Sequence, residues 1–151
     1  MSYMGEWHQV AHIPNWFQRK CVSGAKASYR RLASGQVAVR NECRTKSGLE
    51  SVAGVARPRS GVVVDSGQLR PTLLEVAFVP SWLRWAPLFW ANYDIVYLSP
   101  DQHLATVTEP SRSYMWVLSR TSSIAESEWN LVERRLRELG FQRDQWVRDA
   151  V

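Results

Sequence analysis

Residues 3–18 read YMGEWHQVAHIPNWFQ, and this stretch places a Gly-x-Trp sequence at the start of an expected β-strand over residues 6–12. Residues 13–18 are expected to form the loop that follows this strand. Trp7 alone would fit any buried core position. Whether it marks the place where a fold closes on itself depends on the pattern in the rest of the chain.

Short segments in which apolar and polar residues alternate recur over the first 120 residues. In residues 24–32, Ala27 and Tyr29 share one face of a strand, while Lys26 and Arg30 share the other. This alternation indicates strands with one buried face, and the turn residues between them indicate short connections. The chain is therefore predicted to be all-β, an eight-stranded antiparallel up-and-down barrel. The predicted strands cover residues 6–12, 24–32, 36–43, 51–57, 72–79, 92–98, 103–108 and 114–120.

The pattern changes to helical spacing after the eighth strand. Residues 124–139 are predicted to form one α-helix, with a capping box made by Ser123 and Glu126 and with Gly140 as its end. A single amphipathic helix after eight strands must pack its apolar stripe against the outside of the barrel. The stripe consists of Trp129, Val132, Leu136 and Leu139.

Length and charge narrow the classes of protein. The 151 residues suit a single domain spanning residues 1–151. The net charge is +5, but the arginines are scattered and no basic run of five residues occurs, so no nucleic-acid partner is expected. No stretch is apolar enough for a membrane-spanning helix. Because the chain starts almost directly on the Gly-x-Trp segment, an export signal or a lipid anchor is expected to have preceded residue 1.

Four segments of the chain carry a family pattern. They are YMGEW at 3–7, NWFQRKC at 15–21, RNECR at 40–44 and EPSRSYMWVLSRTSS at 109–123. Together they resemble the lipocalin family, in particular its bacterial outer-membrane and apolipoprotein D-like members, over residues 3 to about 148. Gly-x-Trp alone is a weak signal, whereas Gly-x-Trp with an arginine ending the eighth strand and a following helix is a strong one.

The resemblance implies how one end of the barrel closes. In lipocalins the tryptophan plugs the closed end and the arginine lies across it, which implies structural roles for Gly5, Trp7 and Arg120. We expect a cation–π contact and guanidinium hydrogen bonds to main-chain carbonyls, together worth about 1–2 kcal/mol. Two departures from the family occur. His8 stands where an aromatic residue is common, and the turn after the sixth strand keeps Asp101 but lacks the family's tyrosine.

Strand parity selects the side chains that face the barrel interior. They are mostly apolar, with three tyrosine hydroxyls and one amide but no carboxylate or lysine. Small residues among them leave volume, so the lining suits a fatty acid or a lysophospholipid, and a core filled without ligand is the alternative. The predicted ligand-binding residues are Ala27, Tyr29, Val37, Val39, Asn41, Val52, Gly54, Val76, Phe78, Tyr93, Ile95, Val107, Tyr114 and Trp116.

A tryptophan-rich segment, PSWLRWAPLFWANY at 80–93, lies between the fifth and sixth predicted strands, at the open end of the barrel. Its large apolar side chains cannot all be buried in a short loop. We expect them to form a rim that contacts a membrane surface, and a lid over the cavity or a homodimer interface are the alternatives. The predicted rim residues are Trp16, Phe17, Trp82, Trp85, Phe89 and Trp90.

Cys21 and Cys43 are the only two cysteines. If the first hairpin turns near residue 33, Ser23 lies opposite Cys43, and Cys21 lies one diagonal step away. A small bulge then allows a disulfide, which would fit an exported protein in an oxidising compartment. Two buried free thiols are the alternative.

Metal and catalytic sites are not expected. Of the three histidines, His8 and His12 would share a strand face, but no cysteine or carboxylate stands at ligand spacing, so no metal and no cofactor are predicted. The prediction is a non-enzymatic protein that sequesters a lipid in its barrel, and the resemblance implies storage or transport at the bacterial cell envelope, in the periplasm or outer membrane. Two other functions remain: a partner-binding module using the tryptophan-rich loop, and a barrel enzyme acting through Tyr29, Asn41, Tyr93 or Tyr114.

Overall fold

The computed structural model describes residues 4–14, 21–33, 36–58, 73–77, 91–109 and 111–149. Its order of elements confirms the predicted fold class, eight strands followed by a helix. The strands are β1 (Gly5–His12), β2 (Ser23–Arg31), β3 (Val37–Thr45), β4 (Gly48–Pro58), β5 (Leu73–Ala77), β6 (Ala91–Leu98), β7 (Leu104–Thr108) and β8 (Met115–Ser119). They are followed by α1 (Glu126–Glu138), the 3₁₀-helix η5 (Arg143–Gln145) and the short strand β9 (Val147–Arg148).

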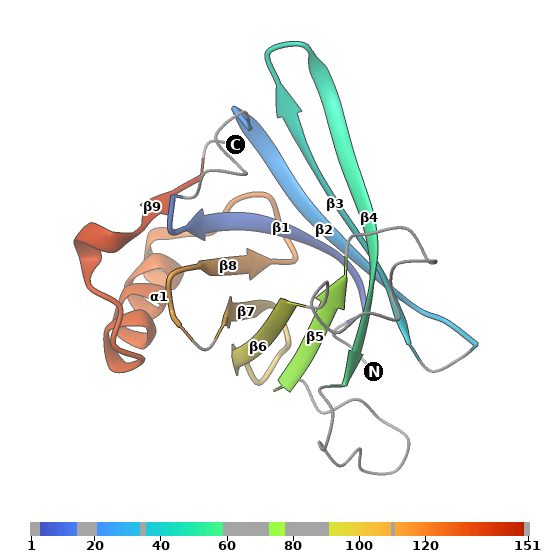
Figure 1. The fold of residues 1–151 in the computed structure, drawn as a ribbon. Coiled ribbons are helices and arrows are strands. Elements are labelled where there is room, and N and C mark those ends of the chain that lie inside the picture. Colours follow the sequence, from blue (N-terminus) through green and yellow to red (C-terminus); the bar gives the residue numbers. More distant parts are fainter. Residues whose placement is uncertain are drawn as a thin grey trace.

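The strands form one antiparallel sheet that closes on itself. Each strand from β2 to β7 pairs with the next one along the chain, and β1 pairs with both β8 and β2. Figure 1 shows the resulting barrel, with α1 beside β7 and β8 on its outer side. Closure removes the sheet edges that would otherwise be open to other chains.

The helix α1 covers the outer faces of β1, β7 and β8. Its apolar stripe is buried at Trp129, Val132 and Leu136, as the spacing predicts. These side chains pack with Leu104 of β7 and Val117 of β8 in a second buried cluster outside the barrel. Within the residues that the structure describes, no helix is long and apolar enough to cross a membrane.

The start of α1 differs from the prediction, and its end agrees with it. Ser123 and Glu126 do not form the capping box, because the backbone is still extended at Ala125, with φ −70° and ψ 158°. The Glu128 carboxylate instead accepts a hydrogen bond of 3.2 Å from the backbone N–H of Ala125. Gly140 ends the helix with φ +95°, a conformation that glycine adopts without strain.

The predicted register of the β2–β3 hairpin was wrong by two residues. We expected Ser23 opposite Cys43, but the regular part of the hairpin pairs Lys26 with Glu42, which centres the turn on residue 34. The ladder is irregular between Ser23 and Lys26, where Gly24 has φ +64°. The expected bulge is therefore present, and it lies at the start of β2.

An irregularity in β1 separates two histidines that we expected on one face. The pairing with β8 shifts between Gln9 and Ala11, so that Val10 is an extra residue in β1. His8 lies opposite Ser119, on the outer face, whereas His12 lies opposite Trp116, on the inner face. The extra residue reverses the alternation, which is the usual effect of a β-bulge.

The β3–β4 hairpin is longer than predicted and extends past the rest of the barrel (Figure 1). β4 starts at Gly48, and only its last four residues, Val55–Pro58, pair with β5. Within the described residues, the part of β4 before Val55 therefore pairs only with β3.

Candidate ligand-binding site

The floor of the barrel is formed by one tryptophan and one arginine. Trp7 is completely buried, and the Arg120 Cζ atom lies 3.7 Å from the centre of its ring. Arg120 Nη1 also donates a hydrogen bond of 3.0 Å to the Glu6 carbonyl. Gly5 adopts φ +100°, and a Cβ there would lie 3.4 Å from Arg120 Nη1. The structure thus places these residues as the family resemblance implies, with β1 and the end of β8 joined at the floor.

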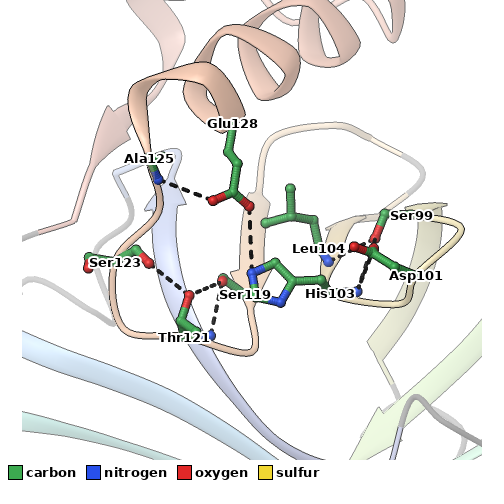
Figure 2. A network of polar contacts seen from close by, with 9 residues as sticks. All are labelled: Ser99, Asp101, His103, Leu104, Ser119, Thr121, Ser123, Ala125 and Glu128. Atoms are coloured by element: carbon green, nitrogen blue, oxygen red, sulfur yellow. Dashed lines mark hydrogen bonds and ion pairs between the residues drawn. The ribbon is translucent and has the colours of Figure 1, made fainter.

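Next to the floor, a polar network joins the β6–β7 turn to the start of the helix (Figure 2). Ser99 Oγ donates a 2.6 Å hydrogen bond to Asp101, which also accepts from the His103 backbone N–H at 3.2 Å. These hydrogen bonds lower the pKa of Asp101, the one from Ser99 most. His103 Nε2 lies 3.6 Å from the Glu128 carboxylate of α1. The turn therefore keeps its conformation without the family's tyrosine.

Above the floor, half of the fourteen predicted lining residues belong to one buried apolar cluster that includes Trp7. They are Ala27, Tyr29, Val37, Val39, Val76, Ile95 and Val107, and Ala105 lies with them. Trp116 is half-buried against the cluster, and Gly54 is buried. Two members were not predicted, Ala56 and Leu118, although each shares strand parity with a residue that was.

Toward the open end, the inner face becomes accessible. Asn41 and Val52 lie opposite each other in the β3–β4 pair, on the same face as Val39, and both are exposed. Val52 is 52% exposed. Tyr114 and Trp116 are half-buried, and their rings stack with centres 6.2 Å apart. The Phe78 and Tyr93 side chains fall outside the described part of the chain.

The inner face also carries a polar group that the sequence did not predict. Gln9 Nε2 donates a hydrogen bond of 2.8 Å to one carboxylate oxygen of Asp149, and His12 Nδ1 lies 2.7 Å from the other. Asp149 follows β9, which pairs with the end of β1. We predicted a lining without a carboxylate because β9 is only two residues long and leaves no local pattern.

The two cysteines form a disulfide. Cys21 and Cys43 are bonded, with their Cα atoms 5.6 Å apart, so the prediction of a bond is confirmed and the free-thiol alternative is wrong. The bond joins the segment before β2 to β3 near the open end. It ties the residues directly before β2 to the hairpin that extends past the barrel.

The predicted rim lies outside the residues that the structure describes. This applies to Trp16, Phe17, Trp82, Trp85, Phe89 and Trp90. Among the described residues, Val22, Leu49 and Val52 are large apolar side chains that are exposed near the open end. They accompany the exposed cations Arg44 and Lys46 of the β3–β4 hairpin.

An eight-stranded barrel with a sealed floor and an apolar inner face defines a class of proteins that enclose one small ligand. The comparisons with known proteins agree with this class. The family model described as a lipocalin-like domain matches residues 1–150. The chain belongs to the lipocalin family, whose members generally bind small hydrophobic ligands.

Two relatives and one solved structure illustrate the similarity. Temperature-induced lipocalin-1 of Arabidopsis thaliana is 34% identical over 140 residues, which cover 90% of this chain and 70% of the relative. The outer membrane lipoprotein Blc of Escherichia coli is 27% identical over 124 residues, which cover 82% of this chain and 63% of the relative. Insecticyanin from the tobacco hornworm Manduca sexta has the same fold, with a TM-score of 0.72, 13% identity, and coverage of 99% of this chain and 79% of its own.

Proposed function

We propose that this lipocalin binds one single-chain lipid, a fatty acid or a lysophospholipid, with its acyl chain on the inner face of the barrel. One observation carries the proposal. The apolar inner face continues from the buried cluster at Val39 to Val52, which lies on the same face and is half exposed. An acyl chain that lies along this face would be removed from water. This burial contributes a favourable binding free energy of about 25 cal/mol per Å² of apolar surface.

The proposal assigns a carrier function and no catalytic step. The described inner face is apolar apart from a few groups toward the open end. The chain's relatives are lipocalins, which are typically binding and transport proteins. Sequestration requires only an apolar lining and an opening through which the ligand passes.

A charge on the inner face of β4 is expected to weaken lipid binding about tenfold. In Val52→Glu, an ionised carboxylate would stand where the proposal places the lipid, which costs desolvation and repels a fatty acid. Fluorescence titration with cis-parinaric acid measures the dissociation constant directly.

Ala53→Glu is the matched control, because Ala53 is exposed on the opposite face of the same strand and gives the same change in net charge. Its affinity should stay within twofold of the wild type. The proposal is contradicted when Val52→Glu binds as tightly as the wild type, or when both variants lose affinity equally.

The same protein is proposed to act at the bacterial cell envelope, with its open end facing a membrane surface. The name of the Escherichia coli relative supports the location, and a disulfide suits an oxidising compartment. The exposed Val22 and Leu49, together with Arg44 and Lys46 at the open end, suit an anionic lipid surface.

A further inference from the structure

The barrel wall has a seam where β2 separates from β1. The two strands pair only between Gly5 and His8 of β1 and the facing residues of β2. Beyond that point, β9 takes the place of β2 along β1, with His12 opposite Val147. The wall between the start of β2 and the C-terminal segment is therefore not closed by backbone hydrogen bonds in the described part of the chain.

A small cavity of about 90 Å³ lies at this seam. Gln9, His12 and Asp149 line one side of it, and Ser23 and Ala25 of β2 line the other. The volume is enough for a few water molecules or for one compact polar group. Gln9 and His12 lie opposite Leu118 and Trp116, whose side chains belong to or pack against the cluster inside the barrel, so the cavity borders the proposed lipid site.

The side of the cavity formed by β1 and the C-terminal segment carries the Asp149 carboxylate. The Asp149 side chain is only 11% exposed, and each of its oxygens has one partner, Gln9 or His12. An ionised carboxylate only accepts hydrogen bonds, so Gln9 Nε2 and an N–H at His12 Nδ1 are its donors here.

Among the described residues that line the cavity, the Arg148 guanidinium is directed to the outside of the barrel. The Arg148 guanidinium donates to Glu126 at 3.1 Å, lies 3.7 Å from Glu133, and stacks 4.2 Å over the Trp129 ring on the outside of the barrel. Within the described lining, the carboxylate of Asp149 is therefore the charged group that is directed toward the seam.

Two aromatic residues lie on or just before β8, the strand that pairs with His12, although neither lines the cavity. Trp116 is the direct cross-strand neighbour of His12, and its ring stacks with that of Tyr114. Faces of indole and phenol rings attract cations, and a carboxylate next to them increases this preference.

We propose that the seam cavity binds the cationic headgroup, an ammonium or quaternary ammonium, of a single-chain amphiphile whose tail lies in the barrel. This proposal rests on the function proposed above and narrows it. An amphiphile with a cationic or zwitterionic headgroup gains contact with Asp149, whereas a free fatty acid brings a second carboxylate to that position and gains nothing from it.

The test compares two amphiphiles of equal tail length and opposite charge, dodecyltrimethylammonium and laurate, both below the concentrations at which they form micelles. Isothermal titration calorimetry gives their dissociation constants. In Asp149→Asn, which preserves an acceptor for His12, the affinity for dodecyltrimethylammonium should fall about fivefold, while that for laurate should stay equal or rise. Asp149→Glu, which keeps the charge, should retain most of the affinity for the cation.

The control is Asp144→Asn, which removes an exposed carboxylate of η5 and changes the net charge equally. It should change neither affinity. The inference is overturned when Asp149→Asn binds dodecyltrimethylammonium like the wild type, or when it loses both amphiphiles equally, as a purely structural role of Asp149 would predict.

Three further outcomes separate the possible sources of failure. Tetramethylammonium has the headgroup without the tail, and binding as tight as that of the amphiphile would overturn the assignment of a lipid ligand to this cavity. If laurate binds the wild type and Asp149 has no influence on the cation, the lipid-binding function stands and only the headgroup site fails. If neither amphiphile binds the wild type, the proposed function itself fails.

Discussion

Trp7→Ala is expected to lower the free energy of unfolding by about 3–5 kcal/mol, the largest effect of a single substitution in this chain. The indole ring is fully buried, it belongs to the apolar cluster that fills the lower barrel, and it carries the Arg120 guanidinium on its face. Its loss leaves a cavity and also removes the contact that joins the start of β1 to the end of β8. Urea denaturation followed by circular dichroism gives the value.

Two comparisons make this prediction specific to the floor. Arg120→Ala should cost about 1–2 kcal/mol, because it removes the cation–π contact and the hydrogen bond to the Glu6 carbonyl but leaves the cluster filled. Trp116→Ala, at a half-buried tryptophan nearer the open end, should cost less than Trp7→Ala. A loss below 1 kcal/mol for Trp7→Ala would show that the floor does not hold the barrel together.

The second large effect is expected from removing the disulfide. The double substitution Cys21→Ser and Cys43→Ser should lower the free energy of unfolding by about 3 kcal/mol, because the bond closes a loop between residues 22 positions apart in the chain. Urea denaturation of the wild type in reducing buffer should give the same loss, and the double variant should not respond to the reductant.

The state of the two thiols is measured independently by alkylation of the unfolded, unreduced protein followed by mass determination. No alkylated cysteine is expected. Two alkylated cysteines would mean that the purified protein lacks the bond, and the expected stability difference would then disappear.

The barrel could be predicted from the sequence because alternation is a local property. The strands other than β1 can be recognised from alternation within each segment, and the helix carries a stripe at Trp129, Val132 and Leu136. The floor could be predicted only through the family resemblance, since nothing local in Gly5–Trp7 refers to Arg120, more than a hundred residues away.

The errors have physical causes that a local pattern does not contain. The extra residue Val10 in β1 reverses the alternation, so His12 faces inward although His8 does not. Val10 and Ala11 are consecutive apolar residues, and both pack on the outer side of the barrel. Such a pair within a strand was the sequence signal that could have indicated the extra residue. Asp149 reaches the inner face because β9 pairs with β1 over a sequence separation of more than 130 residues, which no spacing rule detects.

The central claim is that one hydrophobic molecule occupies the barrel, and native mass spectrometry of the purified protein tests it most directly. The protein should be observed with one bound single-chain lipid, either retained from the cell or added after delipidation, and Val52→Glu should carry less of it than Ala53→Glu does. A spectrum that shows only unliganded protein, unchanged after addition of fatty acids and lysophospholipids, would contradict the account.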